Sequence, residues 1–311
     1  MPMAKGGNIL PVVTVIAAIL VIWCLAVIPM NAHLTADQAQ RDGMTITPEF
    51  AADRQDYLGL TLALKNPAII PLTFVHTRPR LPSPHQVAGE MFRTVFGENI
   101  TSRRSLIYHG WVTLSATLLG FVIGTTLGIL LAIGIVHNRT MDKSVMPWAI
   151  VSQTIPILAL APMIIVILGS IGIQGLLPKS VISAYLSFFP VVVGMVKGLR
   201  SPGAMQLDLL RTYHASDPQG LWKLRLPASI PYLFASLKIG ISAALVGAIV
   251  GELPTGAKAG FGARMLVGDQ YGQPLVTWAA LFAAAITAAG LLAILSMLER
   301  RTLRHMGMVA S

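Results

Sequence analysis

Charged residues are scarce in this chain of 311 residues, because only 12% are Asp, Glu, Lys or Arg, whereas a soluble domain carries about 25%. Hydrophobic residues make up 54% of the sequence. Several stretches of about twenty residues contain no ionisable side chain, which is the length that a helix needs to cross a hydrocarbon core of ~30 Å. The sequence therefore excludes an ordinary soluble protein and predicts an integral membrane protein.

Cysteines and catalytic motifs are scarce as well. Cys24 is the single cysteine, which excludes an intramolecular disulfide and a cysteine-ligated zinc cluster. The phosphate-binding pattern of ATPases needs Gly, four residues and Gly-Lys-Ser/Thr, but the nearest string, which starts at Gly251, places Lys258 one position late. The sequence contains no His-Glu-x-x-His and no Gly-x-Ser-x-Gly. We therefore expect no catalytic residues, no metal site and no ATP hydrolysis by this chain, and a membrane-embedded enzyme is disfavoured.

Six apolar segments predict an all-α membrane protein with about six transmembrane helices. They lie near residues 9–29, 107–136, 145–168, 176–196, 230–253 and 275–298. The first segment is longer than the ~7 to 15 apolar residues of a secretory signal and is followed by no small-residue cleavage site. We expect it to stay in the protein as an anchor.

The formal net charge is +10, and its distribution indicates topology. Lys and Arg form short clusters between the apolar segments and no basic domain with interleaved aromatics, so we expect no nucleic acid partner. With a cytoplasmic N-terminus, eleven of the 23 basic residues fall in cytoplasmic segments, as the positive-inside rule requires. Both termini are predicted to be cytoplasmic, and membrane lipid surrounds the chain.

These segments divide the chain into four regions. Residues 1–30 form a transmembrane anchor, 31–106 an extracytoplasmic segment, 107–298 a transmembrane core with a cytoplasmic loop at 198–231, and 299–311 a cytoplasmic tail. The apolar string at 57–64 is followed by Lys65-Asn66-Pro67. Burying that lysine in the bilayer would cost about 2.5 to 3.5 kcal/mol, so we expect no crossing here, with a seventh span or a re-entrant element as the alternative. Ser83-Pro84 predicts the start of a helix, either at the membrane surface or packed on another outer segment.

Glycines and prolines mark close packing and bends within the core. Gly120, Gly124 and Gly128 share one helix face, which predicts close helix packing inside the subunit or, alternatively, between two copies. Prolines inside apolar segments bend helices, and bent helices often line cavities. The predicted translocation path therefore contains Gln153, Pro156, Pro162, Phe189, Pro190 and Glu252.

Several polar residues near the segment ends have two interpretations. Glu252 either belongs to the path or lies in lipid headgroups. Lys238 is expected to extend its amine to the cytoplasmic face, and His109 and Trp111 are expected to anchor the interface.

The cytoplasmic loop at 198–231 is too short to have its own core. Its apolar residues, among them Leu210, Leu221 and Trp222, need a covering surface. A partner protein is one candidate, and anionic lipid beneath a basic amphipathic loop is the other.

This loop resembles the EAA loop of bacterial ABC importer permeases. In the sequence, Asp208-Leu209-Leu210 is followed after three residues by His214, and Leu226-Pro227 completes the pattern. The family pattern is Glu-Ala-Ala, three residues, Gly, nine residues, Ile, one residue and Leu-Pro. The spacing matches throughout, whereas Asp replaces Glu, two leucines replace the alanines and His214 replaces the glycine.

Other motifs between Leu81 and Arg304 are similar to the nitrate, sulfonate and taurine type of permease. They include Thr154-Ile155-Pro156, Gly251-Glu252-Leu253 and Gly260-Phe261-Gly262. The resemblance implies a transmembrane permease subunit of the bacterial inner membrane that moves a small nutrient, such as an anion or a nitrogen or sulfur compound. A secondary transporter or channel-like carrier is the alternative, but neither internal repeats nor paired acidic residues within the spans are clear.

The resemblance also implies partners. ABC ATPase subunits would bind ATP and Mg²⁺, an extracytoplasmic substrate-binding protein would deliver the substrate, and a second permease copy would complete a homodimer. No cofactor is expected on this chain. The residues implied to contact the ATPase are Asp208, Arg211, His214, Ala215, Ser216, Asp217, Gly220, Leu226 and Pro227.

Overall fold

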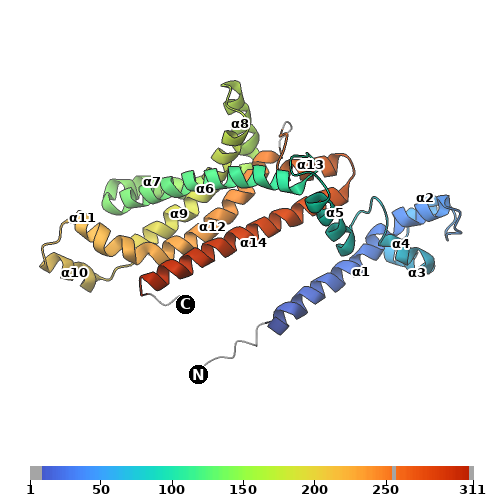
Figure 1. The fold of residues 1–311 in the computed structure, drawn as a ribbon, viewed down its shortest axis with the longest axis horizontal. Helices are drawn as coiled ribbons and strands as arrows, with labels where there is room; N and C mark the ends of the chain where they lie inside the picture. Colours follow the sequence, from blue (N-terminus) through green and yellow to red (C-terminus); the bar gives the residue numbers. More distant parts are fainter. Residues whose placement is uncertain (1–8, 254–256, 308–311) are drawn as a thin grey trace. The chain divides into compact units, whose positions relative to one another are not determined.

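The computed structural model describes residues 9–253 and 257–307 of the chain (Figure 1). Helices form all the regular secondary structure of these residues, which confirms the predicted all-α fold. The elements are α1 Ile9–Arg41, α2 Ala51–Gln55, α3 Gly59–Lys65, η1 Pro67–Ile69, α4 Ile70–Thr73, α5 Pro84–Phe96, α6 Leu106–His137, α7 Arg139–Ser152, α8 Ile157–Ser170, α9 Leu176–Leu199, α10 Ala204–Thr212, α11 Asp217–Gly220, η2 Leu221–Arg225, α12 Leu226–Glu252, α13 Phe261–Gln270 and α14 Pro274–His305.

Within the described residues, five segments are long and apolar enough to cross a membrane, and they centre on α1, α6, α9, α12 and α14. The remaining predicted span is broken. Helices α7 and α8 have 14 residues each and are bent by 98° relative to one another. Counted as one crossing, the pair brings the total to six. The prediction of a single kinked helix at 145–168 was therefore wrong, because Pro156, in an extended conformation, starts a new helix instead of bending the old one.

The chain divides into two compact units, Met1–Ile100 with Arg264–Phe282, and Thr101–Ala263 with Ala283–Ser311. In the first unit, α1 continues 12 residues beyond Pro29, its expected end, to Arg41. The extension buries Ala32 and Ala36 against Leu62 of α3 and Ile69 of η1. Helix α3 has only seven residues, which is too short to cross a membrane.

Helix α5 confirms the start predicted at Ser83-Pro84. Ser83 is its N-cap and Pro84 its first residue, and the Ser83 N–H donates to the Gln86 side chain at 3.1 Å. One face buries Val87 and Thr94, whereas Phe92 and Phe96 on the other face are exposed and contact each other. The helix thus packs on protein with one face and leaves two aromatic rings uncovered.

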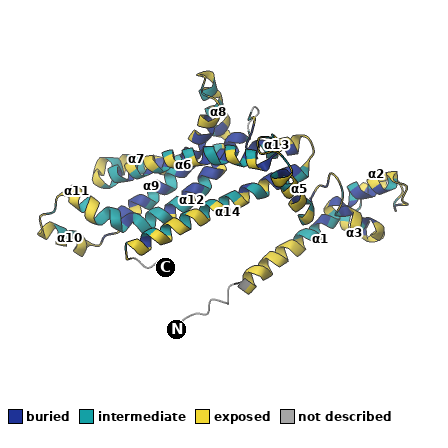
Figure 2. Ribbon diagram, in the orientation of Figure 1, coloured by how far each residue is buried: buried dark blue, intermediate teal, exposed yellow. Residues whose placement is uncertain are grey.

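The second unit is built on α6, α9 and α12. Buried residues are concentrated on these three helices, which contact one another (Figure 2). Methyl groups at Gly120 or Gly124 would overlap Ser183 or Ser187 of α9. The three glycines of α6 therefore serve packing within the chain, as one of the two interpretations predicted.

Lys238 of α12, which was expected to extend its amine to the cytoplasmic face, is half-buried. Its amine lies 2.5 Å from the carboxylate of Glu299 on α14. This ion pair neutralises both charges, which reduces the penalty of placing them within apolar helices.

Candidate functional site

The segment between α9 and α12 forms a chain of short helices. The Gly203 N–H donates to Gln206 Oε1 at 3.1 Å at the start of α10, and the Ser216 N–H donates to Gln219 Oε1 at 3.0 Å at the start of α11. Pro218 lies in the first turn of α11, where its missing N–H leaves no bond unmade. Helix α11 runs directly into η2, which runs into α12.

His214 forms the turn after α10 with a positive φ of 49°. The N–H of His214 donates to the carbonyl of Arg211, and the N–H of Ala215 donates to that of Leu210. These bonds satisfy carbonyls at the end of α10, as a C-terminal cap with one left-handed residue does. Glycine adopts this conformation most readily. His214 occupies the position at which the EAA pattern has glycine, and its backbone has the conformation that glycine favours.

Helix α10 has no buried residue. Asp208 and Arg211 form an exposed ion pair at 3.1 Å, and Ala215, Asp217 and Gly220 lie in the exposed or half-exposed stretch that follows. Four large apolar side chains of the segment are also exposed, namely Met205, Leu209, Tyr213 and Trp222. Such a concentration of uncovered apolar side chains is typical of a surface that binds a partner.

The last two predicted coupling residues, Leu226 and Pro227, are half-buried. Leu226 packs, together with Leu221, on a core that contains Met195 and Leu199 of α9. Pro227 lies in the first turn of α12. In addition, Arg225 donates to the carbonyl of Leu199 at 3.1 Å. These contacts connect η2 and the start of α12 to α9.

The six residues predicted for a translocation path do not form one cluster. Gln153 and Pro156 are exposed in the break between α7 and α8, and Pro162 is exposed on α8. Phe189 and Pro190 are half-buried on α9. Glu252 is completely buried at the end of α12, at 0% exposure, which excludes a position in the headgroups.

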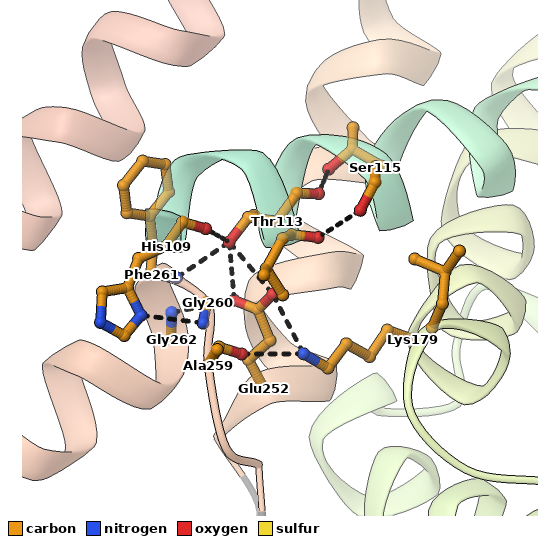
Figure 3. A network of polar contacts seen from close by, with 12 residues as sticks. His109, Thr113, Ser115, Lys179, Glu252, Ala259, Gly260, Phe261 and Gly262 are labelled. Carbon is orange, nitrogen blue, oxygen red and sulfur yellow. Dashed lines mark hydrogen bonds and ion pairs between the residues drawn. The ribbon is translucent and has the colours of Figure 1, made fainter. Parts of the chain in front are cut away.

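Glu252 lies at the centre of a buried polar network (Figure 3). Its carboxylate accepts hydrogen bonds from Thr113 Oγ1 at 2.9 and 3.0 Å, and Lys179 Nζ lies 3.5 Å away. Thr113 comes from α6 and Lys179 from the first turn of α9. One carboxylate therefore joins α6, α9 and α12, on which the second unit is built.

The same side chains hold residues 259–262, which we call the strap. Lys179 donates to the Ala259 carbonyl at 2.9 Å. In addition, three backbone N–H groups of the strap donate to side chains at 2.8 to 3.0 Å. The N–H of Gly260 donates to His109 Nδ1, that of Phe261 to Thr113 Oγ1 and that of Gly262 to Glu252 Oε2. Four consecutive residues are thus fixed by side chains from three helices.

Gly260 and His109 are constrained by this arrangement. Gly260 has φ of 122° and lies so close to Glu252 that a methyl group would overlap the carboxylate. His109 accepts from Gly260 at Nδ1 and contacts the Arg103 carbonyl through Nε2 at 2.9 Å. This pattern assigns the ring proton to Nε2. The prediction that His109 is an interfacial anchor was wrong, because its ring is buried, whereas Trp111 is exposed.

A cavity of about 700 Å³ lies beside the network. Its lining includes Trp111 and Tyr108 of α6, Ile173 and Gln174 before α9, and Lys179. Among the described residues, no cluster of three or more His, Cys, Asp or Glu is arranged for a metal ion.

The chain is similar in sequence to known proteins. The profile of the family described as "Binding-protein-dependent transport system inner membrane component" matches residues 124–306. A probable ABC transporter permease protein of Haemophilus influenzae is 33% identical over 185 residues, which cover 60% of this chain and 70% of that protein.

Two further relatives carry substrate names. The formylaminopyrimidine transport permease protein of Halalkalibacterium halodurans is 33% identical over 183 residues, 58% of this chain and 68% of that protein. The riboflavin transport system permease protein of Chloroflexus aurantiacus is 30% identical over 225 residues, 72% of this chain and 80% of that protein. Permeases named for aliphatic sulfonates and nitrate also match, at 25% identity, which confirms the predicted resemblance to that type.

Proposed function

Because this chain belongs to the family of binding-protein-dependent transport system inner membrane components, we propose that α10, the turn at His214 and α11 dock onto a separate ABC ATPase subunit. The chain itself is the membrane-embedded permease subunit of an importer. ATP and Mg²⁺ bind on the ATPase, and this chain supplies no catalytic residue. An extracytoplasmic binding protein delivers the substrate, and a second copy of the chain completes a symmetric pair across the translocation path.

The observation that carries the docking proposal is the combination of sequence spacing and exposure in one segment. The EAA-like spacing runs from Asp208 to Pro227. This stretch contains most of α10, which has no buried residue, and the exposed rings of Tyr213 and Trp222. Arg225 and Leu226 link this surface to α9 and α12. Movement of an ATPase bound there would be transmitted to the transmembrane helices.

The proposed orientation places α10, α11 and both termini in the cytoplasm. Arg200, Arg211, Lys223 and Arg225 then lie on the cytoplasmic side, as the positive-inside rule favours. The end of α12 at Glu252, with the strap, lies on the opposite side. The buried network is then part of the face that receives substrate from the binding protein.

The substrate that we propose is a small nitrogen- or sulfur-containing nutrient. The relatives with 30 to 33% identity that have substrate names transport formylaminopyrimidine and riboflavin, so a nitrogen heterocycle is the first compound class to test. Uptake of labelled heterocycles, sulfonates and nitrate by cells with and without the gene would identify the class. Equal uptake of all three classes by both strains would contradict the proposal.

Affinity co-purification of the detergent-solubilised chain from its native host tests the docking surface. We expect the wild type to recover an ABC ATPase and the variant Tyr213→Ala/Trp222→Ala to lose most of it, because the variant removes the two largest exposed rings of the segment. The matched control is Phe92→Ala/Phe96→Ala, which removes two equally exposed rings from α5. Recovery of the ATPase with both variants, or with neither the wild type nor the control, would contradict docking at this segment.

A further inference from the structure

Helix α3 exposes apolar side chains on the face that points away from α1. Leu62 and Ala63 are buried against α1, whereas Leu60 and Leu64 are 54% and 68% exposed. The latter two are four residues apart and therefore neighbours on one helix face. Leu58, just before the helix, is 80% exposed. A seven-residue helix that is apolar on both faces is atypical of a surface in water.

Contacts with α1 fix the position of α3 along that helix. A methyl group at Gly59 would overlap the carbonyl of Pro29, so α3 begins at the level of that residue. Close by, Asn31 donates to the Thr73 carbonyl at the end of α4 at 3.1 Å, and Trp23 donates to the Pro82 carbonyl at 2.9 Å. Beyond Pro29, α1 carries Asn31, His33 and Thr35 in place of an uninterrupted apolar sequence. Helix α3 therefore lies where the apolar surface of α1 ends.

Charged side chains of the same segment lie farther along α1. Arg54 of α2 pairs with Asp37 at 2.9 Å and donates to Gln40. Asp37 is eight residues beyond Pro29, which is ~12 Å along a helix at 1.5 Å per residue. Exposed acidic residues of this part include Glu49 and Asp53. The segment thus changes from apolar to charged with increasing distance from the membrane-spanning part of α1.

We propose that α3 inserts Leu58, Leu60 and Leu64 into the lipid of the membrane interface beside α1. The occupant of this face is lipid because the face continues the exposed apolar surface of α1, which carries Val21, Ile22 and Leu25, without a charged residue between them on α1 up to Pro29. Lys65 ends the helix, and its amine lies 4.0 Å from the centroid of the Tyr57 ring. A lysine and a tyrosine are both suited to the boundary between lipid and water.

The inserted helix is distinct from a membrane crossing or a packed outer domain. Seven residues span ~10 Å along the helix axis, so α3 reaches only the outer part of the leaflet, as interfacial helices do. It would hold α1 at a fixed depth. The inference requires that α1 crosses the membrane and is independent of the ATPase docking proposed above.

Fluorescence quenching in vesicles tests the insertion. In a Cys24→Ser background, single cysteines replace Leu60, Leu64, Asp53 or Leu25 in the full-length chain, and each carries a nitrobenzoxadiazole label. The protein is reconstituted into phosphatidylcholine and phosphatidylglycerol vesicles with or without acyl-chain nitroxide lipids. We expect blue-shifted emission at positions 60 and 64, and quenching there about threefold stronger than at position 53, because an interfacial helix buries its apolar face ~5 to 10 Å deep.

Position 25, on the exposed face of α1, reports separately whether α1 is inserted. Strong quenching at position 25 with equally weak quenching at 60, 64 and 53 would overturn the inference while leaving the span intact. Blue-shifted emission at 60 and 64 without nitroxide quenching would also overturn it, because the side chains would then be covered by protein.

Discussion

His214 adopts a left-handed backbone conformation at the junction between α10 and the exposed turn before α11. Left-handed conformations destabilise L-residues by about 1 to 2 kcal/mol, and β-branched residues tolerate them least. We expect His214→Gly to recover the ATPase as the wild type does and His214→Val to recover several-fold less, because valine forces the turn to change. Co-purification of the two variants measures this difference.

The matched control for His214 is His305→Val. His305 is exposed in the last turn of α14, where the backbone is helical and valine fits. If His214→Val recovered as much ATPase as His305→Val, the conformation of the turn would be irrelevant to docking.

Glu252 and Lys179 form a buried ion pair in which each charge compensates the other. Removal of one partner of such a pair destabilises a protein by about 3 to 5 kcal/mol, because the remaining charge is left without compensation. We expect Lys179→Met to lower the temperature at which the purified chain loses its monodisperse peak in size-exclusion chromatography. The strap would lose the bond from Lys179 to Ala259 in the same variant.

The double variant Lys179→Met/Glu252→Gln separates charge from packing. It removes both charges and leaves an amide that can still accept from Thr113 and Gly262, so we expect it to be more stable than Lys179→Met alone. If the double variant lost as much thermal stability as Lys179→Met and Glu252→Gln lose together when made separately, the pair would not be coupled.

Helix α6 approaches α9 closely because one face of α6 carries glycines, which have no side chain. A methyl group at Gly124 would overlap Ser187 and come within 2.7 Å of the Ala184 carbonyl, whereas one at Gly169 of α8 meets nothing within 4 Å. Alanine favours a helix over glycine by about 1 kcal/mol, but overpacking destabilises by about 1 to 3 kcal/mol. We therefore expect Gly124→Ala to lower thermal stability in detergent.

Gly169→Ala makes the same chemical change at an open position and should leave stability unchanged or raise it. Equal thermal stability of the two variants would show that α6 and α9 are not in close contact at Gly124. If Gly124→Ala lowered the thermal stability of an oligomer but not that of the single chain, Gly124 would instead lie at a contact between copies.

Local sequence signals predicted elements but not the partners of buried polar groups. Ser83-Pro84 gave the start of α5, and the spacing of Gly120, Gly124 and Gly128 gave a close contact, because both depend on neighbouring residues of one helix. The pairing of Glu252 with Lys179 and Thr113 joins positions 73 and 139 residues apart. No periodicity links such positions, so the sequence pointed to Glu252 but to neither of its partners, Lys179 and Thr113. The residues of the Gly260-Phe261-Gly262 motif were recognised, but only the structure shows that their amides are the bound groups.

At the scale of the whole molecule, the number of membrane crossings depends on α7 and α8. Each is ~21 Å long at 1.5 Å per residue, which is shorter than the ~30 Å hydrocarbon core. If the pair entered and left on one side, the α10–α11 segment would lie on the side opposite to the N-terminus. Arg211, Lys223 and Arg225 would then be translocated, against the positive-inside rule. We therefore expect α7 and α8 to complete one crossing together.

Cysteine accessibility distinguishes the two topologies. In a Cys24→Ser background, single cysteines replace Asp53, Gln174, Tyr213 or Arg304, all of which are exposed. For six crossings, a membrane-impermeant maleimide should label positions 53 and 174 in intact spheroplasts, and positions 213 and 304 only after permeabilisation. Asp53 follows α1 and is the internal reference for the outer side in both topologies. Labelling of positions 213 and 304, but not 174, in intact spheroplasts would establish five crossings. It would also place the α10–α11 surface out of reach of a cytoplasmic ATPase, so this one measurement tests the topology and the proposed docking together.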